Sequence, residues 1–241
     1  MNLSVGRYLW YGLRDLFYPP ICAGCSGPID EVNAPVCDHC FAALERTQHA
    51  TERGNKVELL FADIGKVGNC AAFCYYKPDS LIRNIIHCVK YSGQPSLGRW
   101  LGKLAATEIM RDNPLFFADI DVVVPVPMHP QKLRQRGYNQ SEEIAAAVAE
   151  VIGKPLNTEC LKKVKMNDSQ THKSAEQRAE NTKNVFAVEK KELLRGKRIL
   201  LVDDIVTTGS TLRDCIRCLH PLPRTTFQIL TMGVATYITA R

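Results

Sequence analysis

The chain has 241 residues, enough for one α/β domain of ordinary size with a small additional module. Hydrophobic residues make up 45% and charged residues 23%, which excludes an intrinsically disordered chain, and no apolar run approaches the roughly 20 residues of a membrane span, so no transmembrane segment is expected. The net charge of +6 lies in the second half, because residues 1–120 hold 12 Lys+Arg and 12 Asp+Glu whereas residues 121–241 hold 19 and 13; this bias favours an anionic partner, with a solvated basic surface as the alternative.

The N-terminal part contains an amphipathic, aromatic segment and then two pairs of cysteines. The segment Arg7–Phe17 is predicted to pack on the domain behind it, with a membrane surface as the alternative. The cysteines form two C-x2-C pairs: Cys22, Cys25, Cys37 and Cys40. Two such turns supply the four thiolates of a tetrahedral Zn²⁺ site. We therefore predict a closed, structural zinc module within residues 1–46, in which His39 could replace one ligand.

The other cysteines are scattered among apolar residues rather than arranged as a secreted disulfide framework, which predicts a reduced, cytoplasmic setting. Cys215 and Cys218 repeat the C-x2-C spacing, but they fall within an expected helix and are predicted to be core residues.

Residues 47–68 are predicted to be a linker, because the polar stretch Thr47–Lys66 indicates little regular structure. Residues 69–241 then form the main domain. Its expected strands are Asn69–Tyr76, Val122–Val126, Val185–Val188, Arg198–Val202 and Phe227–Ala235. Its expected helices are Ser80–Tyr91, Ser96–Arg111, Ser141–Ile152 and Thr211–Leu219. Ser141 is expected to cap its helix, and Asn167–Lys183 to be a mobile loop. The alternation predicts an α/β fold with a mostly parallel sheet flanked by helices.

The segment Arg198–Leu212, RILLVDDIVTTGSTL, combines an apolar strand, two carboxylates and a loop of small residues. Ligands of parallel sheets bind beyond the carboxyl ends of the strands, where Asp203 and Asp204 are expected. The following loop enters a helix, so its backbone amides can bind a phosphate, while the carboxylates can accept hydrogen bonds from sugar hydroxyls. We therefore predict a site for a 5-phosphoribose such as 5-phosphoribosyl-1-pyrophosphate (PRPP), with a capped turn that binds no ligand as the alternative.

The segment VDDIVTTGST resembles the PRPP-binding motif of type I phosphoribosyltransferases. The wider chain resembles the ComF/GntX family of competence proteins, relatives of those enzymes. The supporting features are the N-terminal cysteine pairs, VKYSG at 89–93, VPVP at 124–127, RQRGYNQ at 134–140, and Gln177, Arg178, Asn181 and Phe186. The resemblance implies a type I phosphoribosyltransferase-like fold with a PRPP loop at 202–212.

The resemblance also implies roles for individual residues. The implied PRPP-binding residues are Lys90, Arg134, Arg136, Asp203, Asp204, Thr207, Thr208, Gly209, Ser210 and Thr211. Asp203 and Asp204 would hold the ribose hydroxyls and, with Arg178, act in catalysis. Mg²⁺, Arg134 and Arg136 would neutralise the pyrophosphate; Lys132 is a weaker candidate, and a solvated basic turn is the alternative.

The function implied by the resemblance is a cytoplasmic role in DNA uptake and natural transformation, with incoming single-stranded DNA and DNA-uptake proteins as partners. Binding of the strand would depend on basic side chains, namely Lys132, Arg134, Arg136, Lys162, Lys163 and Lys165. The sequence identifies no acceptor for ribosyl transfer. A metabolic phosphoribosyltransferase acting on a base or amine, and a PRPP sensor without catalysis, therefore stay open as alternatives.

Overall fold

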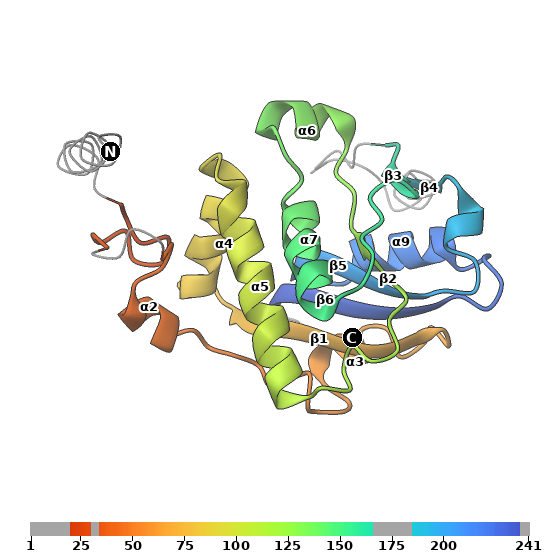
Figure 1. Cartoon of the computed structure of the whole chain (residues 1–241), viewed down its shortest axis with the longest axis horizontal. Helices are drawn as coiled ribbons and strands as arrows, with labels where there is room; N and C mark the ends of the chain where they lie inside the picture. Colours follow the sequence, from red (N-terminus) through yellow and green to blue (C-terminus); the bar gives the residue numbers. More distant parts are fainter. Residues whose placement is uncertain (1–19, 30–33, 166–184, 237–241) are drawn as a thin grey trace, which may run out of the picture.

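Figure 1 shows the computed structural model of the chain, which describes residues 20–29, 34–165 and 185–236. The predicted amphipathic segment Arg7–Phe17 and the predicted loop Asn167–Lys183, with Arg178, lie outside the described residues. No helix among the residues that are described is long and apolar enough to cross a membrane.

A four-stranded sheet forms the centre of the main domain, with the strand order β1-β6-β5-β2 and every neighbouring pair parallel. The strands are β1 Val67–Tyr76, β2 Val122–Pro125, β5 Arg198–Val206 and β6 Thr226–Ala235. Side chains of β5 alternate between two buried clusters: Leu200 and Val202 belong to one, and Ile199 and Leu201 to the other. Because side chains alternate across a strand, the two clusters lie on opposite faces of the sheet. The predicted parallel sheet is confirmed.

Helices cover both faces of this sheet (Figure 1). One face packs against α4 Leu81–Tyr91, α5 Pro95–Asp112 and α7 Gln140–Ile152, and the other against α3 Lys56–Leu59 and α9 Ser210–Leu219. The crossing of α5 and α7 is close, because a Cβ atom on Gly102 would overlap the backbone carbonyl of Ile144. The first turns of α7 and α9 both contribute to the cavity described below, which Gln140, Ser141 and Thr211 line.

Several short elements were not expected from the sequence. These are α2 Asp38–Ala42, α6 Pro130–Arg136, β3 Leu161–Lys163 and η1 Lys191–Leu193. β3 pairs antiparallel with β4 Phe186–Val188, which corresponds to the expected strand Val185–Val188. None of the seven residues of α6 is buried, so no apolar periodicity could have indicated this helix.

The stretch Thr47–Lys66 is more ordered than the predicted linker. It contains α3, whose first turn is capped by the Asn55 side chain. It also buries Phe61, which is 1% exposed, in the cluster shared with α9. The stretch has little regular structure beyond α3, as predicted, but it is not a free linker, because the buried side chains of Val57 and Phe61 dock it on the sheet. The domain boundaries themselves stay a prediction.

Candidate functional site

The two adjacent carboxylates lie inside β5 rather than after it. The strand continues to Val206, four residues beyond its predicted end, and pairs with β6 on both sides of the acids. The alternation of its side chains is interrupted there, since Val202 and Ile205 contribute to one buried cluster and Leu201 and Val206 to the other. In a regular strand, neighbouring carboxylates would point to opposite faces. Here both contact the first turn of α7.

The contacts to α7 come from two consecutive residues. Ser141 Oγ donates a hydrogen bond to Asp203 at 2.8 Å, and Gln140 Nε2 donates one to Asp204 at 3.0 Å. The expected cap function of Ser141 is wrong, because the Asn139 side chain accepts from the Ser141 amide and caps the helix. Because Asn139 caps the helix, the Ser141 hydroxyl is available to donate its hydrogen bond to Asp203.

The two acids differ in their surroundings. Asp203 is buried, and its burial together with the charge of Asp204 raises its pKa to about 7, despite hydrogen bonds from Ser141 and the Asp204 amide. Asp204 instead has a cationic partner, since Lys90 Nζ lies 2.9 Å from its Oδ2. The predicted proximity of Lys90 to the acid pair is therefore confirmed as a contact, although its role in binding stays a prediction.

The loop after β5 has the properties expected of an anion site. Gly209 adopts a left-handed conformation with φ +74°, and α9 starts at Ser210, so the loop turns sharply into the helix. Within the described part of the chain, the amides of residues 207–209 donate no hydrogen bond. The first amides of α9 are also free of intrahelical partners by geometry. The exposed side chains of Thr207, Thr208 and Ser210 add hydroxyl donors to this turn.

The Phe61 side chain packs against this loop. A Cβ atom on Gly209 would approach the Phe61 ring to 3.0 Å, so any other residue would strain the left-handed backbone and require the ring to shift. Arg213, in the first turn of α9, holds the same segment through a bidentate pair with Asp63 at 2.7 and 2.8 Å. The stretch that was predicted to be a linker therefore packs against the loop after β5 and against α9.

The acid pair opens into a cavity of about 350 Å³ at the carboxyl ends of β2 and β5. Four cationic side chains line it: Lys90, Lys132, Arg136 and Lys163. Burial and the neighbouring charge of Lys132 lower the pKa of Lys163, as expected where cations converge without enough anions. A cavity that is lined by two carboxylates and four cationic side chains can bind a polyhydroxylated anion such as a sugar phosphate.

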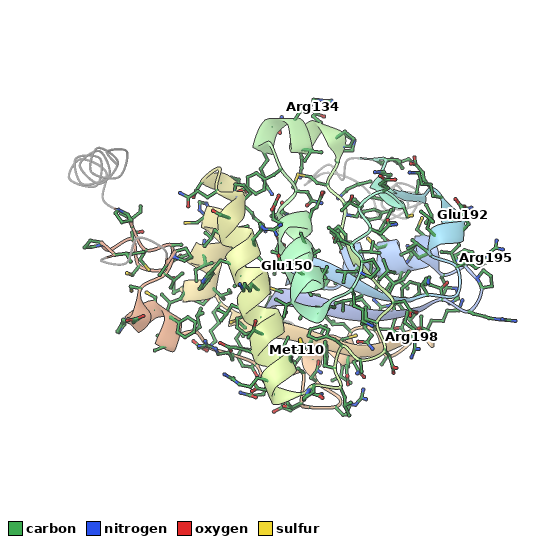
Figure 2. All side chains as sticks on the ribbon, in the orientation of Figure 1. Met110, Arg134, Glu150, Glu192, Arg195 and Arg198 are labelled. Carbon is green, nitrogen blue, oxygen red and sulfur yellow. The ribbon has the colours of Figure 1, made fainter. Side chains whose placement is uncertain are left out.

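The predicted residues are only partly brought together here. Thr211 lines the cavity with the acids, but residues 207–210 lie beside it rather than in its lining. Arg134 is exposed on α6 and points away from the sheet (Figure 2), whereas Arg136 lines the cavity. Prediction from the sequence missed the parts played by Tyr91, Gln140 and Ser141. The motifs VKYSG and RQRGYNQ contain Tyr91 and Gln140, but spacing alone does not show that they meet.

The four N-terminal cysteines form a second polar site. The Sγ atoms of Cys22, Cys25, Cys37 and Cys40 all lie within 4.8 Å of one another. A tetrahedron with Zn–S bonds of about 2.3 Å separates its sulfur atoms by about 3.8 Å, so the donor set fits Zn²⁺. Burial alone would raise the pKa of Cys22, but amide hydrogen bonds, chiefly from Cys37, lower it to about 6, which favours a thiolate. His39 is exposed and outside the cluster.

The third C-x2-C pair does not resemble the first two. Cys215 is buried, and Cys218 is half-buried, with its Sγ donating to the Phe186 carbonyl at 3.3 Å. Both pack in the cluster beneath α9, so the prediction of core thiols is confirmed.

A further cavity of about 340 Å³ lies between the segment 46–51 and the end of α5. Its charged residues largely satisfy one another, since the Arg46 guanidinium donates to both carboxylate oxygens of Glu108 at 2.9 and 2.8 Å. The cavity at the acid pair has about the same size, but it is lined by two carboxylates and four clustered cations, so it is the better candidate for a binding site.

Comparison with known proteins gives consistent results. Residues 138–224 match the model of the phosphoribosyl transferase domain family. Competence protein F of Haemophilus influenzae is 31% identical over 209 residues, which cover 84% of this chain and 85% of that protein. DNA utilization protein YhgH of Salmonella typhimurium is 29% identical over 60% of this chain and 62% of that protein. Competence protein ComFC of Bacillus subtilis is 29% identical over 41% of this chain and 38% of that protein.

Proposed function

Because this chain belongs to the ComF family of competence proteins, we propose that it acts in the cytoplasm during DNA uptake and carries a pocket that binds PRPP. The relatives named competence protein and DNA utilization protein support the role in DNA uptake. The match to the phosphoribosyl transferase domain family supports a ribose phosphate as the ligand.

The observation that carries the PRPP site is the convergence of the acid pair and four cations on one cavity, with the free amides of residues 207–209 beside it. Asp203 and Asp204 would accept hydrogen bonds from the ribose 2- and 3-hydroxyls. The amides of residues 207–211 would hold the 5-phosphate, in line with anion binding at helix N-termini. Arg136 and Lys132, which line the same cavity, would neutralise the pyrophosphate together with Mg²⁺. Arg134, which points outward, is the weaker of the two predicted arginines.

We assign zinc to the four-cysteine module and a structural role to that zinc. Four sulfur ligands leave no open position for a substrate. The module packs directly on α4, because Asn84 Nδ2 donates to the Gly24 carbonyl at 2.8 Å. Zinc would therefore fix the position of the module on the helix that also presents Lys90 to the pocket.

Single-stranded DNA is the proposed macromolecular partner. The cations at the pocket rim and on the neighbouring strand β3, including Lys162 and Lys163, would contact its phosphates. Affinity for a short oligonucleotide should therefore fall steeply as salt increases. Binding that is unchanged between 50 and 300 mM salt (roughly the range over which such contacts are screened) would contradict this part of the proposal.

The cellular role is tested by replacing the gene in its host with the Asp203→Asn/Asp204→Asn variant. We expect a loss of transformation frequency or of DNA use that approaches the loss in a deletion strain, with normal protein level and zinc content. Full function of the deletion strain would overturn the role in DNA uptake. Full function of the variant strain alone would show that the role does not need the pocket.

The match to a transferase domain family favours one alternative, a phosphoribosyltransferase that acts on a base or amine. Pyrophosphate release from PRPP on a panel of acceptors separates the cases. Turnover would support the enzyme, and Arg178 is then the first residue to replace. PRPP binding without turnover would support a sensor.

A further inference from the structure

Tyr91 is an aromatic side chain at the mouth of the pocket that the binding of ribose phosphate alone does not explain. It is the last residue of α4, directly after Lys90, and it lines the cavity. Tyr91 is nevertheless 67% exposed. Single exposed apolar residues are common on protein surfaces. The exposure of Tyr91 therefore indicates a function only if the neighbouring residues support one.

The neighbours of Tyr91 fix the ring and connect it to the acid pair. The His87 ring lies one helical turn earlier, with its centroid 4.7 Å from that of Tyr91. The Arg136 guanidinium lies over the Tyr91 ring, 5.2 Å from its centroid. Arg136 also donates to the Gln140 side chain, which in turn donates to Asp204. A ring held on two sides by such contacts is ordered before any ligand arrives, although most of its surface stays open.

A largely exposed aromatic ring beside a guanidinium is the kind of surface on which nucleobases stack. The position also suits a nucleotide. In the proposed pocket the ribose hydroxyls point to the carboxylates on the floor, so a base on the anomeric carbon has to leave toward the mouth. A sugar phosphate without a base would make no use of Tyr91.

We infer that Tyr91, held by His87 and Arg136, is a stacking platform for a nucleobase adjacent to the ribose phosphate site. This inference rests on the proposed function, since it adds a base to the ligand of the same pocket. The base could belong to a free nucleoside monophosphate or to single-stranded DNA, and both offer the same planar ring to Tyr91.

Calorimetry with three ligands tests the platform: ribose 5-phosphate, AMP and a short 5′-phosphorylated oligodeoxyadenylate. The proteins are the full chain, Tyr91→Ala, Tyr91→Phe and Leu193→Ala, a matched control because Leu193 is 50% exposed and outside the cavity. The quantity of interest is the affinity for AMP relative to ribose 5-phosphate. In Tyr91→Ala this ratio should fall by about 5- to 150-fold, the range for loss of one base–aromatic stack. Tyr91→Phe and Leu193→Ala should keep it.

The ratio separates stacking from an indirect effect through Arg136. If Tyr91 only positioned Arg136, its loss would weaken the phosphate contacts of both ligands, and the ratio would not change. An unchanged ratio in Tyr91→Ala, or equal binding of AMP and ribose 5-phosphate to the unmodified protein, would overturn the inference while leaving the proposed function intact. No binding of ribose 5-phosphate or PRPP to the unmodified protein would instead overturn the proposed function.

The oligonucleotide identifies the source of the base. If its affinity depends on Tyr91 as strongly as that of AMP, the platform receives single-stranded DNA. If only AMP shows this dependence, the platform receives a free nucleotide. Either result supports the stacking platform.

Discussion

The cysteine module and the pocket at the acid pair both contact helix α4, and the chain builds them in different ways. The four sulfur atoms come from residues 22–40, and their spacing alone brings them together. The pocket is lined by residues from 90 to 211, which meet only because the parallel sheet places the ends of β2 and β5 side by side. A local site can be recognised from its spacing, whereas a distributed site needs the fold.

The largest expected effect concerns the local site. Cys40→Ser removes a buried ligand, and the protein should lose its zinc, from about one ion per chain to nearly none, since structural zinc contributes on the order of 10 kcal/mol to small modules. Metal analysis of the purified protein measures this directly. Cys218→Ser has the same spacing motif and should keep its zinc. Zinc loss in both variants, or in neither, would contradict the distinction between the cysteine pairs.

A smaller effect is expected for Gly209, in the loop beside the pocket. Gly209→Ala combines a left-handed backbone with a close approach to Phe61, so it should destabilise the protein by roughly 2–4 kcal/mol in urea unfolding. Gly153→Ala is the matched control, because Gly153 has the same left-handed conformation with open space around it. Its cost should be about 1 kcal/mol. Equal costs would show that the loop does not depend on its contact with Phe61.

The acid pair should make stability depend on pH. Because the pKa of Asp203 is raised to about 7 in the folded chain, the folded state holds this proton more strongly than the unfolded state, and stability is lost as pH rises through about 7. Asp203→Asn should therefore stabilise the protein at pH 8 by roughly 1–3 kcal/mol and by less at pH 5.5.

Urea unfolding at the two pH values measures this difference. Glu192→Gln, which removes an exposed carboxylate, should change stability little at either pH. If Asp203→Asn stabilised the protein more at pH 5.5 than at pH 8, the burial of the Asp203 charge would be misassigned.

The smallest effect is expected at the contact between α9 and the segment beneath the loop. Arg213→Ala removes a partly exposed bidentate pair with Asp63, and it should cost about 0.5–1 kcal/mol in thermal or urea unfolding. Arg217→Ala removes a single hydrogen-bonded pair with Asp214 made by a more exposed guanidinium, so it should cost less. A larger loss in Arg217→Ala would mean that the docking of residues 60–63 is not what Arg213 stabilises.

The same contrast explains how much could be predicted from the sequence. The apolar runs of β2 and β5 and the two C-x2-C turns indicate the sheet and the metal-binding module, because each signal is local. Prediction failed where a residue has a partner far along the chain. Ser141 fits a helix cap, yet its hydroxyl donates to Asp203, and Phe61 lies in a polar stretch yet packs against the loop after β5. Neither contact has a signature in spacing or periodicity.

The most direct test of the account is calorimetry of PRPP with Mg²⁺ on the unmodified protein and on Asp203→Ala/Asp204→Ala. The account predicts saturable binding to the unmodified protein and a loss of affinity of at least about 100-fold in the variant, since two hydrogen-bonding carboxylates are removed. The variant should keep its zinc. Equal affinity of the two proteins for PRPP, or no binding to either, would contradict the assignment of the acid pair to a ribose phosphate site.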